Sequence, residues 1–212
     1  DYVSQHGPLS ISQSVTYLAD VAVAIQHASE REVVHRDIKP SNVLVTQDGR
    51  AKLVDMGLAR SEHVQSTAND LTATGVTLGT FDYISPEQGR DPRSADVRSD
   101  IYSLGCTLYF MLTGQPPFPE GTMLQKLLSH TSDSPPDPRE FRNDVPPRML
   151  AMLGRMLAKQ PAHRYQTADE LLAEILLLAE EEGIRLRTQD KPLVVVERQI
   201  VNDNVWLRQL SW

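Results

Sequence analysis

The run His35-Arg36-Asp37-Ile38-Lys39-Pro40-Ser41-Asn42 decides how this chain of 212 residues is interpreted. Two further runs follow it in order, Asp55-Met56-Gly57 and Ser85-Pro86-Glu87. A positioned carboxylate can accept the proton of an attacking hydroxyl group. Two oxygen ligands together with substrate phosphates are the usual way in which proteins hold Mg²⁺. The three runs therefore predict one site that handles a magnesium-bound phosphate.

The pattern around these runs predicts that their polar side chains meet. Val43–Val45 and Ala51–Val54 are β-type runs, and Asp48-Gly49 between them is a hairpin signal. Asp37 and Asn42 flank the loop that enters this hairpin, and Asp55 follows its second strand, so the hairpin returns Asp55 to the same end. Lys39 lies two positions from Asp37 and is suited to stabilise charge on a transferring phosphoryl group.

The rest of the chain predicts helices. Residues 12–30 have the apolar spacing of an amphipathic helix, and Asp100–Thr113 is apolar nearly all round, which is typical of a helix at the centre of a domain. Val33-Val34 is a further β-type run, and residues 60–82 read as a long loop. Further helices are indicated after Ser85, at Met123–Leu128, at Met149–Leu157 and after the capping box Thr167-x-x-Glu170. The predicted fold class is mainly α with a small β-hairpin.

Composition excludes several classes of protein. The net charge of −7 argues against a nucleic-acid partner held by phosphate contacts. Cys106 is the single cysteine and lies in an apolar run, which indicates a buried side chain and a reducing compartment. No signal peptide opens the sequence, and no apolar run approaches the roughly 20 residues that span a bilayer. We expect no membrane span in these residues and a cytoplasmic location, which is compatible with membrane tethering of a full-length protein.

On these motifs the chain resembles the C-terminal lobe of a eukaryotic-type, or Hanks-type, serine/threonine protein kinase. Ser85-Pro86-Glu87-Gln88 and Ala162-x-Arg164-Tyr165 resemble bacterial members of that family. The resemblance covers residues 1–182, with a catalytic loop at 35–42 and an activation segment at 55–87, and leaves 183–212 as an extension or linker. It implies ATP and Mg²⁺ as cofactors and transfer of the γ-phosphoryl group to Ser/Thr hydroxyls of protein substrates.

The resemblance also implies a role for each motif residue. Asp37 takes the role of catalytic base, and Lys39 contacts the γ-phosphate. Asn42 and Asp55 take the metal-ligand roles, and Leu44 forms the floor under adenine. The hydroxyl of Thr80 helps to hold Asp37 and Lys39.

Further residues are implied to support these groups. His35 packs behind the loop, Asp100 anchors the loop from the central helix, and Glu87 pairs with Arg164. Arg36 precedes the base, an arrangement expected when phosphorylation of the activation segment controls activity. The candidates for that phosphorylation, which adds about −1.5 to −2 charge, are Thr72, Thr74 and Thr77.

The sequence departs from the family pattern in what it lacks. The 212 residues contain no glycine-rich phosphate loop, no strand Lys paired with a helix Glu, and no hinge, all of which belong to an N-terminal kinase lobe. We therefore expect a fragment that is inactive until that missing lobe completes it. We also expect an exposed apolar face near His35, Leu44 and Met56.

Besides an enzyme part, the sequence has two alternative interpretations. A truncated, catalytically silent lobe that acts as a protein-binding module stays open, because the phosphate loop is missing. A purely structural helical domain gives no reason for three polar motifs in this order. Met56 stands where the family has Phe, and Met fills similar space.

Overall fold

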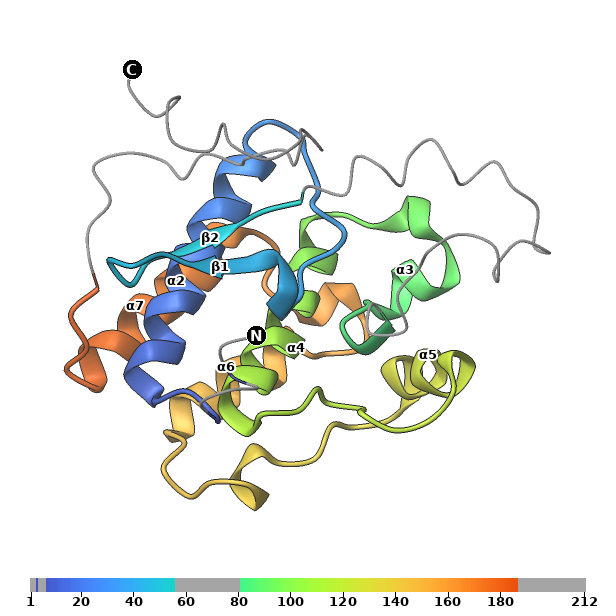
Figure 1. Cartoon of the computed structure of the whole chain (residues 1–212). Coiled ribbons are helices and arrows are strands. Elements are labelled where there is room, and N and C mark those ends of the chain that lie inside the picture. Colours follow the sequence, from blue (N-terminus) through green and yellow to red (C-terminus); the bar gives the residue numbers. More distant parts are fainter. Residues whose placement is uncertain (1–2, 4–6, 56–80, 187–212) are drawn as a thin grey trace, which may run out of the picture.

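Figure 1 shows the computed structural model of the chain, which describes residues 3, 7–55 and 81–186. At its centre lies α4 (Val97–Thr113), in which every residue from Ser99 to Leu112 is buried. Asp96 caps its first turn, and Gly114 ends it with a φ of 82°, a left-handed conformation that glycine adopts without strain. The predicted central buried helix is therefore confirmed, and Cys106 lies fully buried within it.

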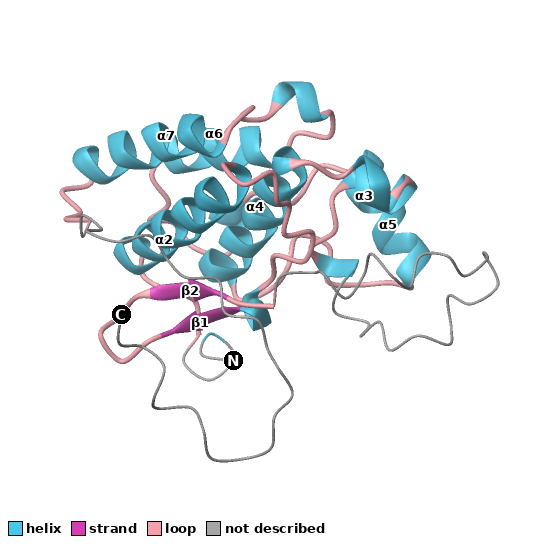
Figure 2. Cartoon of the chain, turned by 90° about the horizontal axis from the view of Figure 1, so that it is seen from above, coloured by secondary structure: helices cyan, strands magenta, loops and turns pink. Residues whose placement is uncertain are grey.

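Helices α2 (Ile11–Ser29) and α6 (Pro147–Met156) pack against α4, and α7 (Ala168–Glu181) packs against both of them. Figures 1 and 2 both show α2 and α7 side by side. The helix predicted over residues 12–30 is confirmed.

The capping box predicted at the last helix is only half formed. Thr167 Oγ1 accepts from the N–H of Glu170 at 3.2 Å, as expected of a cap. The Glu170 carboxylate, however, accepts from the N–H of Gln166 at 3.0 Å. The side chain thus satisfies a donor one residue before the cap.

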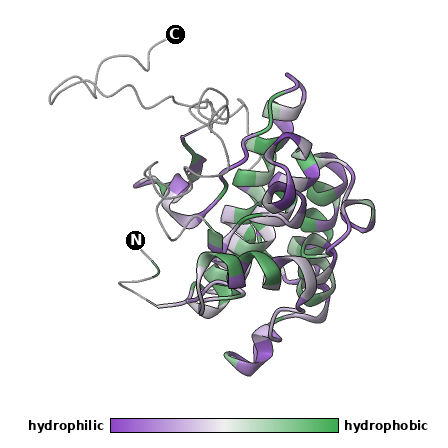
Figure 3. Cartoon of the chain, turned by 90° about the vertical axis from the view of Figure 1, so that its right-hand side faces the viewer, coloured by the Kyte–Doolittle hydropathy of each residue, from purple (hydrophilic) through white to green (hydrophobic). Residues whose placement is uncertain are grey.

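The remaining elements are short. Helix α3 (Pro86–Arg90) begins after the Ser85 cap, as predicted, and contacts α5 (Met123–Ser132). In Figure 3 the apolar residues gather on the helices that pack together. Single 3₁₀ turns lie at η1 (Pro40–Asn42), η4 (Pro92–Ser94), η5 (Pro138–Glu140) and η6 (Pro161–His163).

Strands β1 (Val43–Val45) and β2 (Ala51–Leu53) form an antiparallel hairpin in which Val43 faces Leu53. Gly49 turns the hairpin with a φ of 75°. The carboxylate of Asp20, on α2, accepts from the N–H of Ala51 at 2.9 Å, and this bond fastens the hairpin to the helix. The predicted hairpin is confirmed, and it lies at the edge of the helical body in Figure 2.

The β-type run Val33-Val34 does not form a strand, so that prediction is wrong. The N–H groups that follow it, those of His35 and Arg36, donate to the carboxylate of Asp100 at 2.8 Å each. The Asp100 carboxylate therefore accepts the hydrogen bonds that a neighbouring strand would otherwise accept from these N–H groups. Within the described ranges the protein is mainly helical with one two-stranded sheet, and none of those helices is both long and apolar enough to cross a membrane.

Candidate active site

The 35–42 loop is anchored on the buried start of α4. Asp100 is 1% exposed and accepts from the N–H groups of His35 and Arg36 through its two oxygens. Burial raises the pKa of Asp100 to about 7, against the lowering effect of those two hydrogen bonds. Arg36 has a φ of 66°, which is the left-handed region that residues with side chains rarely adopt. The anchor thus holds an unfavourable backbone conformation directly before Asp37.

His35 joins the loop to the end of β2. Its Nδ1 accepts from the N–H of Asp37 at 3.3 Å, so Nε2 carries the ring proton toward the carbonyl of Val54 at 3.2 Å. Burial lowers the pKa of His35, which keeps the imidazole neutral in this role. His35 therefore lies behind the loop.

The structure corrects the prediction of an exposed apolar face near His35, Leu44 and Met56. His35 is 1% exposed and does not belong to it, because its ring is enclosed between the loop and β2. Leu44, on β1, is 50% exposed and does place an apolar side chain on the surface there. Its strand neighbour Val45 is 41% exposed and points to the opposite face of the hairpin. Met56, the third residue expected there, lies outside the described residues.

Three polar side chains converge within the loop. Lys39 Nζ lies 2.9 Å from Asp37 Oδ2. Asn42 Nδ2 donates to the backbone carbonyl of Asp37 at 2.8 Å and to its Oδ2 at 3.1 Å. Both the ammonium group and the amide contact the same oxygen of Asp37, and together they fix the position of its carboxylate.

The hairpin brings Asp55 to the same end. The N–H of Val54 donates to the carbonyl of Asn42 at 2.9 Å, so the residue after it starts beside the loop. Asp55 has a φ of 60°, a second left-handed residue at this place. The charges of both Asp37 and Asp55 act on the ring of His35. The two carboxylates and Asn42 thus surround one end of the hairpin.

The donor chemistry at this end fits Mg²⁺. The amide of Asn42 is oriented by its two N–H bonds to Asp37, and its Oδ1 accepts no hydrogen bond from the described residues. Asp55 adds a carboxylate one residue beyond the Val54–Asn42 backbone bond. Hard oxygen donors of this kind are the ligands that Mg²⁺ takes alongside phosphate and water.

Glu87 and Arg164 form an ion pair below the loop. The guanidinium is completely buried and donates to both Glu87 oxygens, at 2.6 and 2.9 Å. Ser99 Oγ donates to the same carboxylate at 2.6 Å. Burial alone raises the pKa of Glu87, but the hydrogen bonds from Arg164 and Ser99 outweigh it and hold that pKa below its usual value. The pair ties the start of α3 to the segment before α7.

Several predicted residues lie outside the described part of the chain, and sequence reasoning missed another. Thr72, Thr74, Thr77 and Thr80 fall in the undescribed range 56–80. The missed residue is Gln88, whose Nε2 donates to the carbonyl of Arg36 at 3.0 Å. The sequence places Gln88 in the Ser85-Pro86-Glu87-Gln88 motif without a role, and a single sequence gives no sign of a bond across 52 positions.

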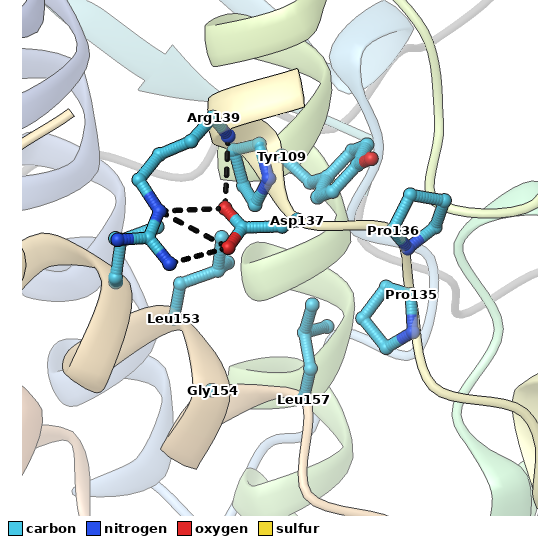
Figure 4. A pocket seen from close by; sticks show the side chains of 10 residues that line it. Tyr109, Pro135, Pro136, Asp137, Arg139, Leu153, Gly154 and Leu157 are labelled. Carbon is cyan, nitrogen blue, oxygen red and sulfur yellow. Dashed lines mark hydrogen bonds and ion pairs between the residues drawn. The ribbon is translucent and has the colours of Figure 1, made fainter. Parts of the chain in front are cut away.

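A cavity of about 260 Å³ lies elsewhere, between α4, α6 and the Pro135–Arg139 stretch. Figure 4 shows the Arg139 guanidinium paired with Asp137 at this cavity, and the shortest of those contacts is 2.6 Å. None of the residues that line it belongs to the 35–42 loop or the hairpin. It is therefore separate from the candidate active site.

The sequence of the chain is similar to those of known proteins. Residues 1–176 match the sequence family described as the protein kinase domain. The serine/threonine-protein kinase PknB of Mycolicibacterium smegmatis is 35% identical over 199 residues, covering 94% of this chain and 31% of that protein. PknB of Mycobacterium tuberculosis is 35% identical over 176 residues, covering 83% of this chain and 28% of that protein. The chain thus spans about a third of the length of these relatives.

Proposed function

The chain belongs to the protein kinase family, and from that premise we propose that residues 1–182 form the C-terminal lobe of a serine/threonine protein kinase. The mainly helical fold with its single hairpin supports this assignment. The similarity to bacterial serine/threonine-protein kinases supports Ser and Thr hydroxyls of proteins as acceptors. Residues 183–212 are an extension or linker.

The reaction that this site supports is transfer of the γ-phosphoryl group of ATP. The hydroxyl oxygen of the acceptor attacks the γ-phosphorus, Asp37 takes the hydroxyl proton, and ADP leaves. The contact of Lys39 and Asn42 with Asp37 Oδ2, at 2.9 and 3.1 Å, is the observation that carries the proposal. It fixes the position of the carboxylate, and in this proposal the Lys39 ammonium group stabilises the charge that develops on the transferring phosphoryl group.

Each other residue at the site has a part in this proposal. Asn42 and Asp55 would hold Mg²⁺, which when bound neutralises charge on the phosphates. Leu44, half exposed on β1, is the floor under adenine. Thr80, which lies outside the described residues, would help to hold Asp37 and Lys39, as the family resemblance implies.

Phosphorylation of Thr72, Thr74 or Thr77 is proposed as the control of this site. Arg36 supports it, because its buried Nε has no hydrogen-bond partner among the described residues. A phosphate group would supply an acceptor for that N–H.

Catalysis also needs groups that the 212 residues do not contain, a glycine-rich loop and a Lys–Glu pair. We propose that an N-terminal lobe supplies them and covers Leu44, whose side chain is half exposed. The second candidate function is a silent lobe that binds protein partners, and the exposed apolar side chain of Leu44 is the observation that favours it.

A phosphorylation assay separates the two candidates. Radiolabelled ATP and a protein acceptor are incubated with the 212-residue chain and with the full-length product of its gene. The proposal expects transfer by the full-length product and none by the 212 residues. Transfer by the 212 residues would refute the need for a second lobe. If the full-length product binds the protein acceptor but transfers no phosphate to it, the binding module is favoured.

A further inference from the structure

Gln88 spans the gap between helix α3 and the 35–42 loop. We propose that it is a positioning residue for Asp37, because its side-chain amide holds the Arg36 carbonyl and so maintains the left-handed conformation that aims the following residue. The inference rests on the proposed role of Asp37 as base. It adds a residue that the sequence motifs alone do not single out.

The side chain of Gln88 is satisfied at both ends. It is 5% exposed, and its Nε2 donates to the Arg36 carbonyl at 3.0 Å. Its Oε1 accepts from Ser85 Oγ at 3.0 Å, and Ser85 Oγ in turn accepts from the N–H of Gln88 at 3.3 Å. Only one orientation of the amide gives the Arg36 carbonyl a donor, so the network fixes which end is nitrogen.

The bond completes a clamp on Arg36. On one side the Arg36 N–H donates to Asp100 at 2.8 Å, and on the other the Arg36 carbonyl accepts from Gln88. A residue with a side chain at a φ of 66° persists only where its surroundings fix it. The clamped carbonyl belongs to the peptide group that joins Arg36 to Asp37. Its orientation therefore sets where the Asp37 side chain starts.

Two other glutamines separate this clamp from ordinary helix capping. Gln13 of α2 and Gln125 of α5 occupy the same third position of a capping box as Gln88. Both accept from the N–H of their own cap residue, at 3.2 and 2.7 Å. Among the described residues, neither has a hydrogen bond to the 35–42 loop, and neither is buried as Gln88 is. Burial and the second bond are thus additions to the cap.

The test compares Gln88→Met with Gln13→Met. Methionine has the length of glutamine and lacks a donor, so each variant loses one capping box and only the first loses the clamp. Amide hydrogen exchange of the 212-residue chain is followed at Arg36 by NMR. We expect protection of the Arg36 amide to fall about tenfold or more in Gln88→Met and to be unchanged in Gln13→Met. Equal protection in the two variants would overturn the clamp.

Two further measurements test the positioning role of Gln88. In the full-length protein, Gln88→Met should lower kcat by about 10-fold to 100-fold with little change in KM for ATP. An unchanged kcat in an active enzyme would overturn the positioning role. If Gln88→Met loses protection of the Arg36 amide while the unmodified full-length protein transfers no phosphate, the clamp is supported and the proposed function is refuted. If Gln88→Met does not fold, Gln88→Glu takes its place. Only the protonated carboxyl of this variant can donate to the Arg36 carbonyl, so protection of the Arg36 amide should rise as the pH is lowered. No such rise would overturn the proposal.

Discussion

Replacing Arg164 by methionine should be among the most destabilising single changes in this fold. The guanidinium donates to both oxygens of Glu87 and to the backbone carbonyls of Ala158, Arg98 and Lys159, at 2.7, 2.9 and 3.1 Å. It also lies 4.7 Å from the ring centre of Tyr102. Methionine keeps the packing volume and removes every donor.

The magnitude follows from what the substitution leaves behind. Removing one partner of a buried ion pair costs about 3–5 kcal/mol, because the other charge stays buried without compensation. Glu87 keeps the Ser99 hydrogen bond at 2.6 Å and its side chain is 14% exposed, so the lower end applies. About 3 kcal/mol in a chain of this size corresponds to a fall in Tm of about 6–12 °C.

Urea unfolding followed by far-UV circular dichroism measures this loss. The midpoint should fall with no change in the m-value, which reports the surface exposed on unfolding. Arg139→Met is the matched control, because Arg139 pairs with Asp137 on the surface, where the two side chains are 59% and 38% exposed. It should leave the midpoint unchanged. A loss below about 1 kcal/mol for Arg164→Met would refute the argument, since that is the range of surface pairs.

Three further outcomes are expected. Gly105→Ala should destabilise the fold by about 1–3 kcal/mol in thermal unfolding, because its Cβ would lie 3.0 Å from Leu157 Cδ2 and Met156 Cβ. A Cβ at Gly154 would have no atom within 4 Å, so Gly154→Ala should instead raise the free energy of unfolding by about 0.5–1 kcal/mol. If Gly105→Ala were the more stable of the two variants, the packing of α4 on α6 would be contradicted. Lys126→Met should lower the free energy of unfolding in urea by about 3 kcal/mol, because it leaves the mostly buried Asp82 carboxylate without its cation. Adding Asp82→Asn to the Lys126→Met variant should recover most of that stability, and no recovery would contradict the ion pair. The pKa of Glu87 lies below 4.5 in the folded state, so its ionised carboxylate stabilises the fold above about pH 4.5, and this stabilisation is lost as the pH falls through the folded-state pKa. Glu87→Gln should therefore make the free energy of unfolding depend less on pH in that acid range. An unchanged pH dependence would contradict the lowered pKa.

Much of the fold could be predicted because its signals are local. Ser85 and Thr167 accept hydrogen bonds at helix starts where the sequence predicts caps. Gly49 and Gly114 have positive φ at a turn and a helix end where glycine is the expected residue. The apolar pattern of α4 predicted its central place, because a helix apolar on all sides has no face for water.

What the sequence did not predict depends on contacts between distant positions. Val33-Val34 has strand character, but the carboxylate of Asp100, far along the chain, takes the N–H groups that follow it. Glu170 has the position of a capping-box partner, and its carboxylate bonds to Gln166 instead. Gln88 looks like a cap residue until the 35–42 loop is folded against it. Local propensity carries no information on such bonds.

The same division applies to the candidate site. The order of the motifs predicted that Asp37, Lys39 and Asn42 would share one loop, and the structure brings them within hydrogen-bond distance. Their precise contacts depend on the hairpin, which is fastened to α2 through Asp20. That fastening has no sequence signature.

The most direct test of the central claim is the single-turnover rate of phosphate transfer by the full-length protein carrying Asp37→Asn, at saturating ATP and Mg²⁺. Asparagine keeps the shape of the side chain and cannot accept the hydroxyl proton as a carboxylate does. Loss of a general base typically slows a reaction by about 10² to 10⁴-fold, and we expect a loss in that range. Asp137→Asn, a surface change near η5, should leave the rate unchanged. Transfer by Asp37→Asn at the rate of the unmodified protein would contradict the assignment of Asp37 as the base.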